Sequence, residues 1–482
     1  MTITKQNFKK INDFLWEIPK SFRQDMKVPA RVYVSEKMLE EVFRDESIPQ
    51  LINGATLPGI QKYAIAMPDM HEGYSVPIGF VGAIKIPDGI ISPGATGFDI
   101  NCGMKLLKSN YSEKEIRPHL DKLATEIQKE VPSGLGRGRQ IKLSIGEIDK
   151  ILEGGTKRLV EQGYGEKEDI ENCEAGGRLD WADASAVSSY AKNRGRDQVG
   201  TLGSGNHFLE VQKVAEIFDE KIANAFGLFK DQIVIMIHTG SRGLGHQVCT
   251  DYLRTMIPAM QRYGIKVPDR EFACVPFNSP EGQRYFSAMA SAANYAWANR
   301  QMIAYFIRKA WKSVLGEKTS PLTVLYDVAH NIIKKEKYLI DGKETEVAVH
   351  RKGATRAFPP GHPEIPEKYQ SVGQPVLIPG SMGTASYVLV GTKEGEAAFF
   401  STCHGAGRTM SRHEAMRRVS GQEVVKELED KGIIVKCWSS RGIAEEAPIA
   451  YKDIDEVVQV VHNAGLSKKV AKLIPLAVIK GE

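Results

Sequence analysis

The chain has 482 residues, of which 42% are hydrophobic and 26% are charged, a composition typical of a globular protein with a large core. The 64 Lys and Arg residues nearly balance the 59 Asp and Glu residues, so a net charge of +5 excludes bulk positive charge as a means of binding nucleic acid. No apolar run approaches the roughly 20 residues of a membrane span, no apolar secretory segment opens the chain, and six cysteines lack a disulfide spacing, so we expect a cytoplasmic protein without a membrane partner.

The first half of the chain alternates between expected strands and expected helices. Residues 1–50 indicate an N-terminal appendage of helix and turn, and the Gly- and Pro-rich stretch 52–103 predicts short strands joined by tight turns. Residues 114–165 have a mainly helical pattern, which glycines and arginines interrupt at 134–139. At 200–211 a glycine-rich turn is expected to enter a strand.

The second half contains the clearest strands and the longest helix. The apolar run 232–237 predicts a buried strand that ends at His238, and residues 322–331 repeat this pattern and end in His330 and an asparagine. Helices are expected at 244–263, 288–315 and within 409–431, and the aromatic side chains of 288–315 are expected to pack in the core. Two strands are expected within 371–390, and the chain then closes in a C-terminal tail.

These elements predict one domain in spite of the length. No linker rich in Ser, Gly or Pro divides the chain, and the candidate site residues run from position 69 to position 480. We therefore expect residues 1–482 to form a single domain of the mixed α/β (α+β) class. In it, central β-sheets carry the candidate ligands at strand ends and helices pack around them, although the order of the strands is not readable from the pattern.

Five side chains form a candidate metal centre. Asp99 and Cys102 lie three residues apart in a turn bounded by glycines, His207 opens an expected strand, and His238 and His330 each close one. One cysteine near an aspartate is more often a buried small residue, and one histidine at a strand end more often caps the backbone. Together, however, five ligands can hold two metals if the thiolate bridges them. Imidazole and thiolate favour Zn, Fe, Co or Mn over Mg or Ca.

A second group of residues suits the binding and transfer of phosphate. Glycine loops around residues 204–206, 380–383 and 405–407 can present backbone N–H groups to phosphate, the last of them at an expected helix start, although such a loop alone is usually a turn. His404 precedes the third loop, and a neutral imidazole there can attack phosphorus while Arg408 and Arg412 hold the charge. Arg242, close behind His238, is a further candidate anion clamp.

The remaining histidines are weaker candidates. His71 and His246 are expected to line the site without acting as ligands. The others occur in charged or loop contexts and are expected to be solvated: His119, His350, His362, His413 and His462.

Six motifs together resemble the RtcB family of RNA ligases over nearly the whole chain. They are Asp99–Gly103, Leu202–Glu210, His238–Gly245, Asp327–Asn331, Pro379–Gly383 and His404–Arg408. The resemblance implies ligation of an RNA end that carries a 3′-phosphate or 2′,3′-cyclic phosphate to a 5′-hydroxyl, with GTP and Mn²⁺ as cofactors. It also implies that the guanylate passes from GTP to His404 and then to the RNA 3′-phosphate, before the 5′-hydroxyl displaces GMP. Two metals suit this chemistry, because they neutralise a phosphate and orient in-line attack.

The resemblance also assigns the roles of single residues. It implies that Asp99, Cys102, His207, His238 and His330 hold two Mn²⁺ ions, that His404 is the nucleophile, and that Asp69 is needed for the later steps. The nucleotide contacts that it implies are Asn206, Phe208, Leu209, Glu210, Asn331, Pro379, Gly380, Ser381, Met382, Ser386, Gly405, Ala406, Gly407, Tyr451 and Lys480. In a regular strand Phe208 and Glu210 would lie on one face and His207 on the opposite face. For all three to reach the same site, the backbone must be irregular at this point. The RNA-phosphate contacts would be Arg242, Arg408 and Arg412.

The partners expected from the resemblance are tRNA halves and broken RNA ends, with archease as an activator of a monomeric enzyme. Two other functions are compatible with parts of the pattern. A two-metal phosphoesterase or ribonuclease needs the same Asp, Cys and His cluster but not a nucleophilic His404. A non-catalytic RNA-binding protein should show a basic, aromatic surface, against which the balanced charge counts.

Overall fold

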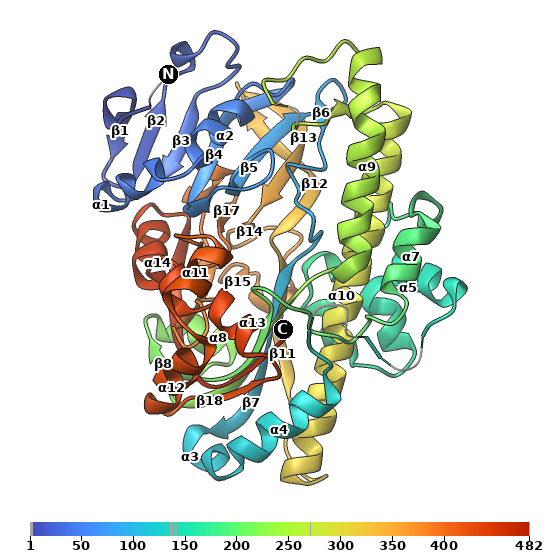
Figure 1. Ribbon diagram of the computed structural model, residues 1–482, viewed down its shortest axis with the longest axis vertical. Coiled ribbons are helices and arrows are strands. Elements are labelled where there is room, and N and C mark those ends of the chain that lie inside the picture. Colours follow the sequence, from blue (N-terminus) through green and yellow to red (C-terminus); the bar gives the residue numbers. More distant parts are fainter. Residues whose placement is uncertain (1–2, 135–137, 140–141, 270, 482) are drawn as a thin grey trace.

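The computed structural model of the chain describes residues 3–134, 138–139, 142–269 and 271–481 (Figure 1). One of its two large sheets has seven strands, in the spatial order β1 (Lys9–Asn12), β2 (Leu15–Ile18), β3 (Ala30–Tyr33), β4 (Ile60–His71), β5 (Ile78–Lys85), β13 (Lys343–Lys352) and β12 (Asn331–Ile340). The predicted strands within 52–103 are confirmed, but the expectation of helix and turn for residues 1–50 is wrong in part, because β1 to β3 belong to this sheet. Strands of four residues are too short to show alternation, and pairing with β4 decides their conformation.

The second large sheet has eight strands and carries the candidate site. Its spatial order is β11 (Thr323–Ala329), β7 (Gly103–Ser112), β9 (Gln232–Thr239), β8 (Phe208–Ile217), β19 (Ser467–Lys480), β16 (Ser386–Gly391) and β15 (Pro375–Ile378), and β18 (Ile434–Cys437) pairs with β19. The expected strands that lead to His238 and His330 are confirmed. The expected C-terminal tail is instead the long inner strand β19, whose apolar residues pair with both β8 and β16.

The directions of these strands bring distant residues to one edge. From β11 to β15 every neighbouring pair is antiparallel, so the ends of β11, β9 and β19 lie beside the starts of β7 and β8. Met104, His238, Phe208 and Lys480 are in register across four adjacent strands. Side chains from the two halves of the chain therefore meet where these strands stop.

Helices cover the sheets, as expected. Their bounds are α1 (Glu36–Leu39), α2 (Ser47–Gly54), α3 (Glu113–Ile116), α4 (Leu120–Glu130), α5 (Ile145–Glu161), α6 (Lys167–Glu171), α7 (Ser189–Gly195), α8 (Glu220–Phe226), α9 (Arg242–Arg262), α10 (Pro280–Leu315), α11 (Arg412–Arg418), α12 (Gly421–Asp430), α13 (Ser440–Glu445) and α14 (Ile454–Asn463). Short two-stranded sheets pair β6 (Ile90–Ile91) with β10 (Val275–Pro276), and β14 (Ala354–Arg356) with β17 (Ser401–Cys403). Among the residues that the structure describes, no helix is long and apolar enough to cross a membrane.

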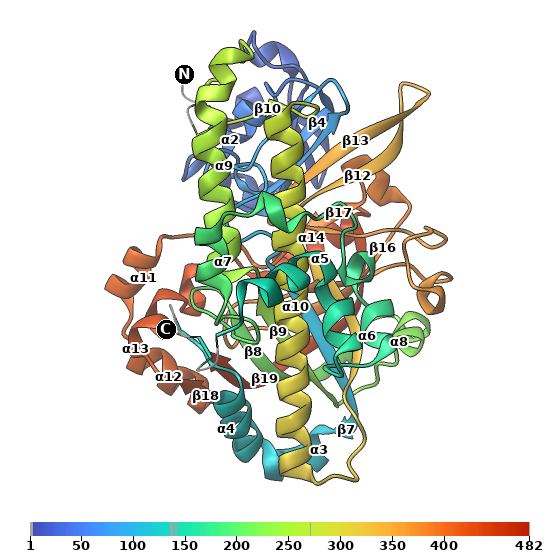
Figure 2. The ribbon, with the colours of Figure 1, turned by 90° about the vertical axis from the view of Figure 1, so that its right-hand side faces the viewer.

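Helix α10 is the central helix of the molecule and runs along much of its length (Figure 2). Ser279 caps it by accepting a hydrogen bond from the Gly282 N–H, and Pro280 follows at the first helical position. The helix therefore starts earlier than the 288–315 pattern predicted. Tyr295, Trp297 and Trp311 are buried, as predicted for the aromatic residues of this helix, whereas Tyr305 is half-buried. The helices expected within 114–165 are α3 to α5, and residues 135–137 and 140–141 lie outside the described residues.

Candidate functional site

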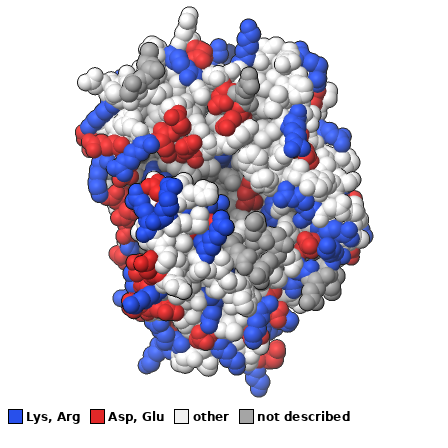
Figure 3. Space-filling model, in the orientation of Figure 1, with Lys and Arg blue, Asp and Glu red and all other residues white. Residues whose placement is uncertain are grey.

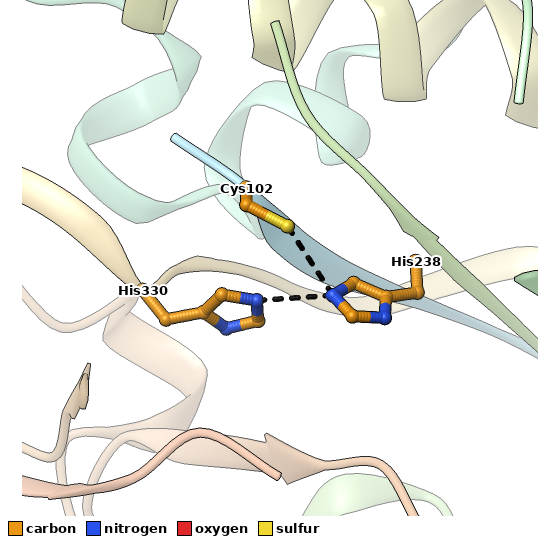
Figure 4. A group of neighbouring side chains, drawn as sticks. All are labelled: Cys102, His238 and His330. Carbon is orange, nitrogen blue, oxygen red and sulfur yellow. Dashed lines mark hydrogen bonds between the residues drawn. The ribbon is translucent and has the colours of Figure 1, made fainter. Parts of the chain in front are cut away.

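Cys102 lies at the centre of the gathered side chains. Its Sγ is 3.3 Å from His238 Nε2 and 3.6 Å from His207 Nε2. On one side, His238 Nε2 lies 3.2 Å from His330 Nε2, so that Cys102, His238 and His330 point their donor atoms into one space (Figure 4). These donor atoms all lie within 4.8 Å of one another.

A second group shares the same sulfur. Asp99, Cys102 and His207 also bring their donor atoms within 4.8 Å of one another, and Asp99 Oδ2 is 2.8 Å from His207 Nε2. The Ser241 backbone N–H fixes the other Asp99 oxygen at 3.0 Å. The Thr239 hydroxyl donates to a backbone carbonyl and lies 3.4 Å from His207 Nδ1, which directs Nε2 toward Asp99 and Cys102.

The protonation of these groups suits a cation. Burial lowers the pKa of both the His238 and the His330 imidazoles well below the usual value, so both are neutral ligands. Burial and then the Asp99 charge raise the pKa of the Cys102 thiol well above its usual value. Burial by itself raises the pKa of Asp99, but the hydrogen bond and charge of His207, the hydrogen bond of Cys102 and the charge of Arg242 together outweigh it and lower the pKa to about 2. A cation bound to the sulfur would release the thiol proton.

The donor set fits two transition-metal ions that share one sulfur. It offers three imidazole nitrogens, one sulfur and one carboxylate oxygen, and the two triads meet only at Cys102. The Nδ1 atoms of His238 and His330 are buried without a hydrogen-bond partner in the described part of the chain, and their Nε2 atoms face each other. A neutral imidazole can turn an Nε2 lone pair toward a cation, so the two facing Nε2 atoms and the Cys102 sulfur fit the metal centre that the sequence predicts.

His404 lies beside this cluster, in the loop after β17. Its ring centroid is 5.2 Å from that of His330. Its Nδ1 lies 2.5 Å from Asp69 Oδ2, which also accepts the backbone N–H groups of His404 at 2.8 Å and of Gly405 at 3.2 Å. Asp69 is fully buried in β4 and thereby directs His404 Nε2 to the opposite side. A Cβ at Gly407 would come within 2.0 Å of the Asp69 carbonyl oxygen, so this approach requires glycine.

A cavity of about 200 Å³ joins His404 to Cys102, His238 and His330, and its described lining does not include Asp99 or His207. Of the predicted site residues, its lining includes Cys102, Asn206, Phe208, His238, His330, Asn331, Pro379, Gly380, Ser381, Met382, His404, Gly405, Ala406, Gly407, Arg408, Arg412, Tyr451 and Lys480. His71 also lines it, as expected; burial and then the charge of His404 lower the pKa of His71 to about 3. A cavity of about 350 Å³ lies elsewhere against α5 and α10, and one of about 740 Å³ against α6 and α10; their described linings contain none of these residues.

Three predicted nucleotide contacts lie behind the cavity wall. Leu209 packs in the core beneath the sheet. The Gln212 amide donates both to Glu210 Oε2 at 2.7 Å and to Ser386 Oγ at 3.0 Å. Burial raises the pKa of Glu210 to about 8, and its other oxygen has no hydrogen-bond partner among the described residues. The irregularity expected before Phe208 is the loop ahead of β8, where Gly203 and Gly205 have positive φ.

One site residue was missed at the level of sequence. Glu446 is buried and accepts hydrogen bonds from Arg408 at 2.9 Å, from Arg412 at 2.8 Å and from Tyr451. Lys480 donates to the Gly205 carbonyl at 2.7 Å beside them. No spacing in the sequence distinguishes Glu446 from the adjacent Glu445, and only the fold brings the two arginines to Glu446.

Arg408 and Arg412 also correct an expectation. They were expected on one helix that begins at the 405–407 glycines, but α11 begins at Arg412, where Ser411 is the cap. The positive φ of Gly407 prevents a helix from starting earlier. Arg242 is not in the described lining of the cavity, and it donates to Thr201 Oγ1 at 3.2 Å and to the Gly134 carbonyl at 3.3 Å.

Most of the remaining histidines have the solvent exposure that their sequence contexts predicted. His119 and His413 are exposed and His362 and His462 are half-buried, whereas the expectation that His350 is solvated is wrong. His350 is buried because β13 is an inner strand between β5 and β12. The His246 ring lies 5.0 Å from that of Phe98, near Asp99 but outside the metal triads.

Comparison with known proteins gives close matches along the chain. The family model described as tRNA-splicing ligase RtcB matches residues 50–481. The proteins named tRNA-splicing ligase RtcB of Thermococcus kodakarensis and Archaeoglobus fulgidus are each 52% identical to this chain, over 98% of it and 98% of their own length. The RNA-splicing ligase RtcB of Mycobacterium tuberculosis is 51% identical over 90% of this chain and 100% of its own length.

Proposed function

Because this chain belongs to the RtcB family of tRNA-splicing ligases, we propose that it is a GTP-dependent RNA ligase that acts through a GMP–histidine intermediate. The proposed substrates are an RNA end with a 3′-phosphate and a second end with a 5′-hydroxyl. A 2′,3′-cyclic phosphate would first take up water to give the 3′-phosphate. The observation that carries the proposal is the placement of His404, with Nδ1 on Asp69 and its ring beside the metal candidates in one cavity.

The first proposed step forms a bond between His404 Nε2 and the α-phosphorus of GTP, and pyrophosphate leaves. Asp69 accepts a hydrogen bond from Nδ1–H and stabilises the positive charge that develops on the ring, which keeps its Nδ1 proton. In the second step an oxygen of the RNA 3′-phosphate attacks the same phosphorus, and His404 leaves as neutral imidazole. In the third step the 5′-hydroxyl attacks the RNA phosphate, loses its proton and displaces GMP.

Two Mn²⁺ ions are proposed at the two triads. Asp99 and His207 would hold one, His238 and His330 the other, with Cys102 bridging them. When bound, such ions neutralise phosphate charge and align the attacking and leaving oxygens. The cavity residues would hold the nucleotide: the backbone N–H groups of the 380–383 and 405–407 loops suit phosphate, and Glu210 and Lys480 lie near the same wall.

The proposal includes the setting in which the enzyme works. We expect a cytoplasmic monomer that acts on tRNA halves and broken RNA ends, with archease as its activator. Lys and Arg side chains are interspersed with Asp and Glu over the face in Figure 3, so RNA recognition is assigned to Arg408, Arg412 and Arg242 around the site and not to bulk charge.

The experiment incubates the protein with α-³²P-labelled GTP and Mn²⁺ and follows acid-labile label on the protein. We expect labelled wild type, no label on His404→Ala, and full labelling of the control His462→Ala, whose histidine lies outside the cavity lining. A two-metal phosphoesterase that uses the same cluster would cleave RNA phosphates and remain unlabelled. Unlabelled wild type with intact Mn²⁺ binding would therefore replace the ligase mechanism with that alternative.

A further inference from the structure

The five candidate ligands come from four segments, and each segment lies where a strand of the eight-stranded sheet stops. The pairing of β7 with β9 begins at Gly103 opposite Thr239, so the residues that precede Gly103 have no strand partner there. Cys102 therefore lies one residue beyond the β7–β9 ladder, and its carbonyl accepts the His330 N–H at 2.9 Å. Another group must satisfy the backbone carbonyls at this edge and set the spacing of the ligands.

Arg300 of α10 occupies this position behind the metal triads. Its Nη1 donates to the Asn101 carbonyl at 2.8 Å and to the Thr239 carbonyl at 2.9 Å, which belong to the residues next to Cys102 and His238. Its Nε donates to Asp327 Oδ1 at 2.9 Å, three residues before His330. Its Nη2 also donates to the Asn101 side chain at 3.0 Å. One guanidinium therefore contacts three of the four ligand segments.

The neighbouring residue reaches the fourth segment. Asn299 Oδ1 accepts the backbone N–H groups of Gly200 at 2.8 Å and Thr201 at 3.1 Å, in the loop that leads to His207. Its Nδ2 donates to the carbonyls of Thr201 and Gly240, each at 3.1 Å. The side chains of Asn299 and Arg300 are fully buried, so water does not compete for these bonds.

The local sequence accommodates this cation. A Cβ at Gly103 would lie 3.0 Å from the Arg300 guanidinium carbon and 2.2 Å from the Val328 carbonyl oxygen, so the residue after Cys102 must be glycine. Asp327 compensates the buried charge at 2.8 Å. Arginine is required because its planar fork serves several acceptors at fixed angles, which a lysine ammonium cannot reproduce.

We propose that Arg300, together with Asn299, is the positioning group of the metal centre and preforms it by fixing the four ligand segments. This inference rests on the proposed metal-dependent function. The inference assigns a role to a residue that is not itself a ligand. In the described structure Arg300 does not line the nucleotide cavity and makes no hydrogen bond to a ligand side chain.

The test measures Mn²⁺ affinity of metal-stripped protein by calorimetry, and the thiolate-to-metal absorption of the Co²⁺-loaded protein. We expect Arg300→Lys to weaken Mn²⁺ binding about tenfold or more, as changes behind metal ligands do, and to reduce the Co²⁺–thiolate band. The matched control is Arg308→Lys on the same helix. Arg308 makes a two-pronged pair with Asp169 at 2.6 and 2.7 Å and contacts none of the four ligand segments in the described structure. The control should lower the Tm while Mn²⁺ affinity and the Co²⁺ band stay unchanged.

A milder variant covers the case in which Arg300→Lys does not fold. Asn101→Gly keeps the positive φ at this position but removes one acceptor of Arg300, and should weaken Mn²⁺ binding by a smaller factor. Wild-type affinity in both Arg300→Lys and Asn101→Gly, or an equal loss in Arg308→Lys, would overturn the positioning role and leave the proposed function intact. A wild-type protein that binds no Mn²⁺ would overturn the metal centre and this inference with it.

Discussion

At the level of single residues, the Asp69 carboxylate determines which nitrogen of His404 is free to react. The backbone N–H groups of His404 and Gly405 hold Asp69 Oδ2 in place, and rotation of the ring would break its hydrogen bond to Nδ1. The pattern of the sequence predicted His404 as a nucleophile from its place before a glycine loop. It indicated no partner for it, because Asp69 is 335 residues away in the chain.

The variant Asp69→Asn removes the negative charge at this position while keeping an oxygen that can hold His404 in place. The amide oxygen can still accept the three hydrogen bonds, but it no longer stabilises a positive imidazole. We expect the rate of protein guanylylation to fall at least about 100-fold, as with neutralised carboxylates behind catalytic histidines, while the Tm stays close to that of wild type. Rapid-quench labelling with GTP measures the rate. Labelling at the wild-type rate would show that Asp69 has no electrostatic role in this step.

Glu210 gives a prediction about pH. Because burial raises its pKa from 4.5 to about 8, the folded chain keeps this proton between those values while the unfolded chain loses it. Its contribution to stability is therefore complete below about pH 4.5 and disappears as the pH rises to about 8. We expect Glu210→Gln to match the wild-type Tm at pH 5 and to exceed it by roughly 2 °C or more at pH 9. If the Tm difference between variant and wild type is the same at pH 5 and pH 9 in calorimetric scans, the raised pKa of the buried Glu210 carboxyl is contradicted.

At the level of elements, α10 connects stability with the site. Ser279 caps this 36-residue helix at an end remote from Arg300. Ser279→Ala should lower the free energy of unfolding by about 1 kcal/mol, with the rate of guanylylation unchanged. Thermal unfolding and labelling of the same preparation test this. A loss of labelling at a temperature where the variant is folded would mean that the helix transmits strain to the ligand segments.

The elements also show what the sequence pattern can predict. The strands that end in His238 and His330 were predictable because each is an apolar run followed by a polar residue. Strands β1 to β3 were not, because four-residue strands lack a periodicity of their own, and β19 was not, because Pro475 and two register shifts interrupt its alternation. The candidate ligands were therefore predictable one by one. Their meeting at one edge depends on the strand order, which the pattern does not contain.

At the level of the whole molecule, the two large sheets are joined at the site. β11 of one sheet continues into β12 of the other, and His330 is the residue between them. One hydrophobic core also includes Ala64 and Val81 from the seven-stranded sheet together with Val376 and Leu389 from the eight-stranded sheet. We therefore propose that residues 1–482 form one domain, in which Asp69 of the first sheet and the metal ligands of the second are held in fixed relation.

The most direct measurement of the central claim is mass spectrometry of the protein after incubation with GTP and Mn²⁺, with digestion under alkaline conditions that preserve a phosphoramidate. We expect one peptide to gain the mass of GMP, and fragmentation to place this mass on His404. We expect Cys102→Ser to reduce the yield, because the sulfur proposed to bridge the two ions is lost. A GMP adduct on a lysine, or a guanylylated His404 formed equally well in metal-stripped protein, would contradict the central claim.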